Sequence, residues 1–236
     1  MKEHLDEEYL GSYVPHQAHL GENMSTLLHI DSSFNHTTSV SREISEAFAS
    51  AWKEAHPGGK CIYRDLAGDT QLAHLDSAAF AAARIDEGQH TPEQAERWAV
   101  TKVIVDELLA ADTIVIGAPM HNFSVASTLK AWLDRIAIPR FMVNRDTGDG
   151  PLVGKKVVVV TARGGSYAPG APRAHFDFQE PYLRAFFSQV GLERDLTFVH
   201  TEFTMAAVVP ALAQFKDRAT ASREAARYAA QRLSAA

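Results

Sequence analysis

This chain of 236 residues has only one cysteine, no excess of basic residues and no long apolar run. The single cysteine, Cys61, cannot form an internal disulfide, which favours a reducing compartment. Lysine and arginine number 23 against 29 aspartates and glutamates, so the net charge of −6 provides no basic field for nucleic acid or anionic lipid. The apolar runs are too short to span a bilayer, and the acidic start lacks the order of a signal peptide. We therefore expect a cytoplasmic protein with no nucleic-acid or membrane partner.

Several motifs for catalysis and nucleotide binding are also missing. The chain has no GxxxxGK[ST] and no GxGxxG after a strand, which argues against nucleoside triphosphate and dinucleotide platforms. It has no GxSxG for a Ser-His-Asp hydrolase and no HExxH for zinc. The 11 histidines are scattered without the spacing of metal ligands, so we expect no metal.

Apolar periodicity instead predicts strands that alternate with helices along one domain. The predicted strands are Thr26–Ile30, Lys60–Arg64, Thr113–Ile116, Lys156–Thr161 and Leu196–Thr201. The predicted helices are one that begins at Val40 behind the N-cap Ser39, one that opens with Thr91-Pro92-Glu93, then Ser124–Ala137, Glu180–Val190 and Ala211–Leu233. This pattern predicts an α/β fold, namely a flavodoxin-like doubly wound parallel sheet of five strands in the order 2-1-3-4-5, with helices on both faces.

Three stretches have weaker signals. Residues 1–23 have no clear period, so we expect a largely disordered extension ahead of a domain over residues 24–236. Asp65–Thr91 reads as an irregular connection with one short helix near Ala78–Arg84, and connections of this length often cover sites. Aromatic and β-branched residues on both sides of Asp146–Gly150 predict a hairpin.

The loops after the first, third and fourth strands would meet at the carboxyl edge of this sheet, where open α/β sheets bind ligands. The first loop is rich in hydroxyls and opens a helix at Ser39-Val40-Ser41, where free N–H groups and the helix dipole favour a phosphate. The second presents Met120–Phe123 to a flat aromatic ligand. The third contains Gly164 and Gly165, which would let a ring approach the backbone, with Arg163 nearby and Tyr167 as a wall or lid.

Each loop also has a structural interpretation that the sequence leaves open. The serines are commonly ordinary helix caps, Met120–Phe123 is compatible with a packed turn, and Arg163 could pair with a carboxylate. None of the loops offers a nucleophile beside its base.

Four longer runs together carry a resemblance to a known family. They are DSSFNHTTSVSREI, ADTIVIGAPMHNFSVASTLKAWLDRIA, KKVVVVTARGGSY and FQEPYLRAFFSQVGL. Because these runs occur in this order, the chain resembles the FMN-dependent NADH-azoreductases, or NADH:quinone oxidoreductases, of the flavodoxin-like fold. The resemblance extends from Met24 onward. In the matching motifs His121 stands where Tyr is common, and Ala162 stands where many members have Ser. These departures bear on the substrate face and on the flavin potential.

The resemblance implies tightly bound, non-covalent FMN and a homodimer with sites at its interface. Ser33 and the Ser39-Val40-Ser41 turn would hold the phosphate. The residues that would line the ribityl chain and the ring are Met120, His121, Asn122, Phe123, Ala162, Arg163, Gly164 and Gly165. The flavin would carry hydride from NADH or NADPH to a quinone or azo compound by a ping-pong mechanism, with two rounds for each azo bond and with assistance from Arg163, Tyr167 and His121.

Two other functions remain compatible with these residues. A flavodoxin-type carrier would exchange single electrons with protein partners, although such carriers usually have a strongly acidic docking face and −6 is mild. A flavin-free regulatory protein could also retain the fold, since fold alone does not determine function.

Overall fold

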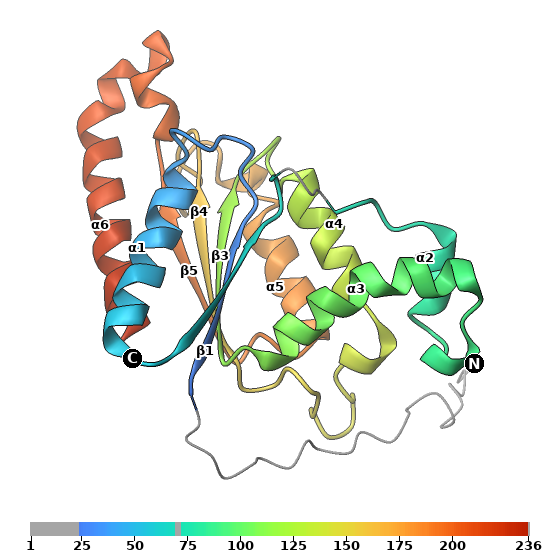
Figure 1. Ribbon diagram of the computed structural model, residues 1–236. Coiled ribbons are helices and arrows are strands. Elements are labelled where there is room, and N and C mark those ends of the chain that lie inside the picture. Colours follow the sequence, from blue (N-terminus) through green and yellow to red (C-terminus); the bar gives the residue numbers. More distant parts are fainter. Residues whose placement is uncertain (1–23, 69–71, 236) are drawn as a thin grey trace.

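The computed structural model describes residues 24–68 and 72–235, so the predicted extension over residues 1–23 lies outside the described residues. Five parallel strands form one sheet in the order β2-β1-β3-β4-β5 (Figure 1). The strands are β1 (Thr26–Asp31), β2 (Lys60–Asp65), β3 (Thr113–Pro119), β4 (Lys156–Ala162) and β5 (Asp195–Thr201). All five predicted strands and their predicted order are confirmed.

Helices cover both faces of the sheet (Figure 1). On one face lie α1 (Val40–Ala55) and α6 (Lys216–Ser234), and on the other lie α3 (Pro92–Ala110), α4 (Ser127–Ile136) and α5 (Glu180–Gln189). A short helix, α2 (Ser77–Ala82), precedes α3, which confirms the predicted short helix in this connection. Within the described residues, none of the helices is both long and apolar enough to cross a membrane.

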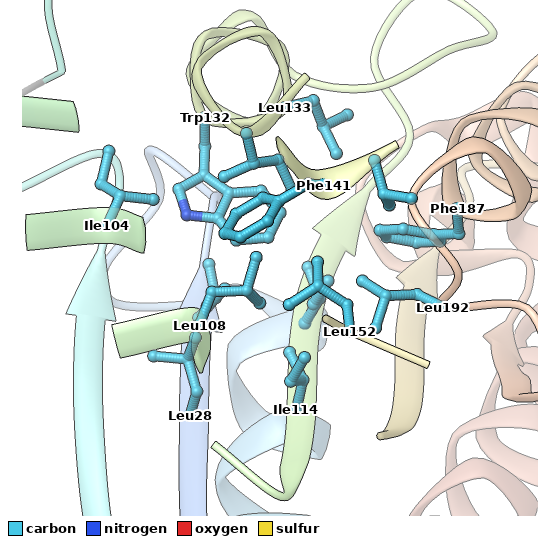
Figure 2. Packing of buried hydrophobic residues seen from close by; sticks show 14 of the residues in the cluster. Leu28, Ile104, Leu108, Ile114, Trp132, Leu133, Phe141, Leu152, Phe187 and Leu192 are labelled. Carbon is cyan, nitrogen blue, oxygen red and sulfur yellow. The ribbon is translucent and has the colours of Figure 1, made fainter. Parts of the chain in front are cut away.

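Two hydrophobic cores lie on opposite faces of the sheet because successive strand residues point to opposite sides. Val157 and Val159 pack with α3, α4 and α5, whereas Val158 and Val160 pack with α1 and α6. The first core is the larger, and Figure 2 shows its residues from several elements converging, including Leu108, Trp132, Phe141 and Phe187. Burial on both faces explains why the central strands are nearly all apolar.

The predicted helix starts at α1 and α3 are confirmed by their caps. Ser39 Oγ accepts a hydrogen bond from Arg42 N at 3.4 Å, so it caps α1. Thr91 and Gln94 form a capping box at the start of α3, with Pro92 in the first turn. Both caps satisfy amides that the first turn of a helix leaves free.

The predicted hairpin around Asp146–Gly150 is wrong. Phe141 and Leu152 on its two sides are drawn into the larger core, and Val143 N bonds to Gln189 O at 3.0 Å instead of to a second strand. Asn144 Oδ1 accepts hydrogen bonds from the amides of Asp146 and Thr147, which makes a compact turn.

Two predicted helices also begin later than expected. The helix predicted from Ser124 begins at Ser127, because Ser124 is held in a turn with His121. The helix predicted from Ala211 begins at Lys216, after a 3₁₀ helix over Pro210–Phe215. The register of the sheet is unaffected by either difference.

Candidate functional site

The loops after β1, β3 and β4 meet at the carboxyl edge of the sheet, as predicted from strand order. Ser32 N and Ser32 Oγ both donate to Gly117 O, at 3.1 and 2.8 Å, which ties the β1 loop to β3. Met120 N donates to Ala162 O at 2.9 Å, which ties the β3 loop to β4. The predicted site residues are therefore brought to one edge by backbone contacts.

The β1 loop presents hydroxyls around the start of α1. Ser33 and Ser41 are buried, and Ser39 Oγ lies 3.1 Å from Ser41 Oγ. Among the described residues no group accepts a hydrogen bond from the amides of Val40 and Ser41. This end of α1 thus combines free donors, hydroxyls and the positive end of the helix dipole, which suits an anion.

Arg42 anchors the β1 loop through hydrogen bonds and an ion pair. Its guanidinium donates from Nε and Nη2 to Ser33 O at 3.0 and 2.6 Å, and from Nη2 to Asp65 Oδ1 at 2.6 Å. Burial raises the pKa of Asp65, but the hydrogen bonds from Arg42 and from Ala67 N–H outweigh it and leave that pKa below its ordinary value. Arg42 is therefore a fixed cation within the loop that carries Ser33.

Asp31, the last residue of β1, extends this hydrogen-bond network. It is 3% exposed, and its carboxylate accepts hydrogen bonds from Ser45 Oγ at 2.8 Å and from Tyr63 OH at 3.2 Å. Burial, followed by the charge of Asp31, raises the pKa of Tyr63 to about 12. Tyr63 therefore stays protonated and keeps donating to Asp31 at neutral pH.

The β3 loop is a tight turn with unusual backbone conformations. His121 N and Ser124 N each donate to the other residue's carbonyl at 2.9 Å, and between them Asn122 and Phe123 have φ of 47° and 70°. Left-handed backbone is uncommon for a residue as bulky as Phe, and such strain concentrates at functional sites. Both interpretations that the sequence left undecided, a packed turn and a ligand-binding loop, are therefore compatible with this structure.

The His121 side chain is directed to a cavity of about 560 Å³ beside the start of α4. Its ring lies 5.0 Å from the ring of Phe34, and both line the cavity together with Asn122, Thr128 and Tyr182. Burial lowers the pKa of His121 below its ordinary value of 6.5, so the imidazole is neutral at pH 7. We call this space the α4 cavity.

The β4 loop leaves space above its second glycine. A Cβ built on Gly164 would lie 2.9 Å from Met205 Cγ, whereas a Cβ on Gly165 would meet no atom within 4 Å. Gly165 thus faces open space at the sheet edge, and Ala162 ends β4 next to Pro119. The chain itself does not require a glycine at position 165, so a ligand that approaches the backbone there is a physical reason for one.

The side chains of Arg163 and Tyr167 are both buried next to the β4 loop. Arg163 is 2% exposed, and its Nη2 lies 3.0 Å from Asp177 Oδ2 and 3.7 Å from Glu180 Oε2. Tyr167 is 8% exposed, and both residues line a second cavity of about 600 Å³ next to α5. The predicted pairing of Arg163 with a carboxylate is present, but the pair is buried.

Sequence reasoning missed three residues at this edge. Arg42 and Tyr63 gave no signal, because their roles depend on contacts between β2, the β1 loop and α1. Glu202 could have been found, because it directly follows β5, and all parallel strands end at the same edge.

The comparison with protein families agrees with this architecture. Residues 25–231 match the family described as having a flavodoxin-like fold. The chain belongs to this family. The flavodoxin-like family membership accounts for the strand order and for the position of the loops at one edge.

Named relatives are similar over nearly the whole chain. A protein of Parafrankia sp. called FMN-dependent NADH:quinone oxidoreductase is 43% identical over 213 residues, 90% of this chain and 100% of the relative. The azoreductase of Bacillus anthracis str. Sterne has a TM-score of 0.76 at 24% identity, covers 90% of this chain and 99% of its own, and supports the fold alone. An FMN-dependent NADH-azoreductase from Bacillus anthracis str. Ames Ancestor, in complex with FMN, has a TM-score of 0.71 at 25% identity over 89% of this chain and 100% of its own.

Proposed function

We propose that this protein is an FMN-dependent NADH:quinone oxidoreductase that also reduces azo compounds. The full-length similarity to a relative of that name, at 43% identity, is the main support. The site adds a second support, because the chain offers an anion-binding helix start and an open glycine at one sheet edge. NADH and NADPH both remain candidate donors, and the cytoplasmic location stays a prediction.

The residues at the edge fit FMN. The buried Ser33 and Ser41, with Ser39 and the free amides of α1, would hold the phosphate. The Met120–Phe123 turn would contact the ribityl chain and the ring from the β3 side, and the Ala162–Gly165 backbone would contact the ring from the β4 side. The space over Gly165 supports this placement, since an added Cβ there meets nothing in the protein.

Bound FMN would supply the hydride chemistry, in a ping-pong cycle that takes two rounds for each azo bond. The chain itself would orient the ring, exclude water and place donors against developing negative charge. The amides of Gly164 and Gly165 are suited to that last role, because no group among the described residues accepts a hydrogen bond from them. Arg163 would contribute positive charge from below the loop rather than by contact, given its pairing with Asp177.

His121 would face the acceptor, since its ring lies in the α4 cavity with Phe34. A neutral imidazole donates one hydrogen bond and accepts another, so it can pair with a quinone carbonyl or an azo nitrogen. The replacement of a common Tyr by His121 would then alter the choice of acceptor.

We also propose a homodimer that closes over the site. Phe34, Phe123, Phe176 and Phe178 are between 39% and 68% exposed, and Phe176 stacks on Phe123 at 5.2 Å. Exposed aromatic groups around a ligand site are a common feature of interfaces. A partner subunit would cover them and supply the remaining wall of the flavin pocket.

A spectroscopic titration tests the proposal. The purified protein is mixed with FMN, freed of excess, reduced with NADH without oxygen, and then mixed with menadione or an azo dye. We expect retained flavin absorbance, bleaching by NADH and recovery by either acceptor. A colourless protein would contradict FMN binding. Flavin that NADH cannot bleach would contradict the oxidoreductase and favour a single-electron carrier.

A further inference from the structure

The segment after β5 binds the β4 loop along its length. The amides of Phe203, Thr204 and Met205 donate to the carbonyls of Gly165, Arg163 and Gly164, at 3.1, 3.0 and 3.4 Å. We call this segment, residues 202–205, the β5 clamp. It satisfies every carbonyl of the loop from residue 163 to residue 165.

The side chain of Glu202 adds three more hydrogen bonds between the clamp and the β4 loop. Its Oε1 accepts hydrogen bonds from Tyr167 N at 2.7 Å and Ala168 N at 3.1 Å, and its Oε2 accepts one from Ser166 Oγ at 2.6 Å. Glu202 N donates to Ser222 Oγ of α6 at 2.9 Å. Three donors of the loop thus converge on one carboxylate that is itself attached to the α6 face.

Backbone strain shows that the clamp is held firmly. Phe203 has φ of 60°, a left-handed conformation that is uncommon for an aromatic residue. Its ring is 8% exposed, stacks on Phe215 at 5.1 Å and lies 4.6 Å from the guanidinium of Arg218. A strained conformation persists only when surrounding contacts enforce it, so packing on α6 fixes the position of Glu202.

The result is an uneven distribution of hydrogen bonds in the β4 loop. The carbonyls of residues 163–165 and the amides of residues 167 and 168 are bonded to the clamp. The amides of Gly164, Gly165 and Ser166 donate to no group among the described residues. Fixed, unpaired donors beside the open space at Gly165 are an arrangement that stabilises negative charge.

We propose that Glu202 is a positioning residue that aims these three amides at the reduced flavin. This inference rests on the proposed function. A reduced flavin carries more negative charge than an oxidised one, so fixed donors stabilise it more. A Gln at position 202 keeps the shape and can still accept from Tyr167 N and Ala168 N, with its Nε2 donating to Ser166 Oγ, but it carries no charge. Because hydrogen bonds to a carboxylate are stronger than those to a neutral amide, the anchors of the loop would then be weaker.

The test compares Glu202→Gln with the wild type in three measurements on the full chain. Hydrogen exchange of the apo-protein should be about tenfold faster at the amides of residues 167 and 168. The Kd for reduced FMN should rise about tenfold more than the Kd for oxidised FMN, which lowers the two-electron midpoint potential by about 30 mV. Ser166→Ala, which removes one of the three bonds, should produce smaller changes in the same direction. Glu193→Gln, an exposed carboxylate elsewhere, is the matched control and should change none of them.

Unchanged exchange in the Glu202→Gln variant would overturn the clamp. Equal losses of affinity for both redox forms would overturn the role of the amides, because the loop would then only shape the pocket. If the wild type binds no FMN, the proposed function is contradicted, and so is the inference that Glu202 positions the amides toward a flavin. A wild type that binds FMN, together with a Glu202→Gln variant that matches it, contradicts the positioning role alone.

Discussion

The carboxylate of Asp31 occupies the space that a side chain at Gly117 would need. A Cβ built on Gly117 would lie 2.3 Å from Asp31 Oδ1 and 3.2 Å from Ser45 Oγ. Gly117 also accepts two hydrogen bonds from Ser32, so the first bend of the β1 loop and the buried carboxylate share one small space between β1 and β3.

Gly117→Ala should therefore destabilise the protein. Since Asp31 is 3% exposed and bonded on several sides, it cannot move away without breaking its network, and overpacking of this kind costs about 1–3 kcal/mol. Urea denaturation followed by circular dichroism measures the change. Gly88→Ala, where an added Cβ meets nothing, is the control and should lie within about 0.5 kcal/mol of the wild type. Equal stability of both variants would contradict the close approach.

Gly165→Val should lower FMN affinity without lowering the stability of the apo-protein. No protein atom lies within 4 Å of the added Cβ, so any crowding must come from a ligand. Fluorescence titration with FMN should show a loss of about tenfold or more, equivalent to about 1.4 kcal/mol. Gly88→Val is a matched control in equally open space. Unchanged affinity in the Gly165→Val variant would contradict the placement of the ring.

Arg42→Lys should weaken binding of FMN more than binding of riboflavin. Lysine keeps the charge between Asp31 and Asp65 but cannot reproduce the forked contact with Ser33 O, so the serines of the phosphate site lose their support. We expect about a tenfold loss for FMN and little change for riboflavin, which lacks the phosphate. Arg64→Lys, which disturbs the ion pair between Arg64 on β2 and Glu107 on α3, is the control. Equal losses for both ligands would place the defect elsewhere.

His121 should titrate below pH 6.5. Burial lowers its pKa in the folded protein, so its contribution to stability is full above the unfolded value of about 6.5 and is lost as the pH falls through the lowered folded value. An NMR titration of the imidazole measures this pKa directly. Phe34→Ala removes the neighbouring ring, which exposes the imidazole, and should raise the pKa of His121 towards 6.5. A wild-type His121 that titrates at or above 6.5 would contradict its burial in the α4 cavity.

Phe178→Asp should prevent the proposed homodimer. Phe178 is 57% exposed beside the site, and its backbone N–H donates to Phe123 O and to Phe176 O, each at 3.1 Å, so a change of side chain leaves these bonds in place. Sedimentation velocity should show a dimeric wild type and a monomeric variant. Tyr228→Asp on α6 exchanges a residue that is 63% exposed and should leave the dimer unchanged. A monomeric wild type would contradict the homodimer itself.

The order of the strands and the convergence of the loops followed from the sequence alone. Periodicity is a local property, and parallel strands in alternation with helices have few possible arrangements. The short apolar run Thr113–Ile116 was enough to place Met120–Phe123 at the carboxyl edge, because any loop that follows a parallel strand leaves the sheet there. The starts of α1 and α3 were predictable for the same reason, since caps act within one turn.

Only the tertiary structure decided which way the side chains of these loops point. Arg163 is next to the two glycines in sequence, yet Asp177 and Glu180 draw its guanidinium below the loop. The anchoring of the β4 loop by Glu202 depends on a residue from another part of the chain in the same way. The predicted hairpin does not form because Phe141 and Leu152 pack in the larger core with residues that are distant in the sequence. Local sequence determines where strands, helices and turns form, whereas the direction of each side chain is settled by neighbours that are remote in the chain.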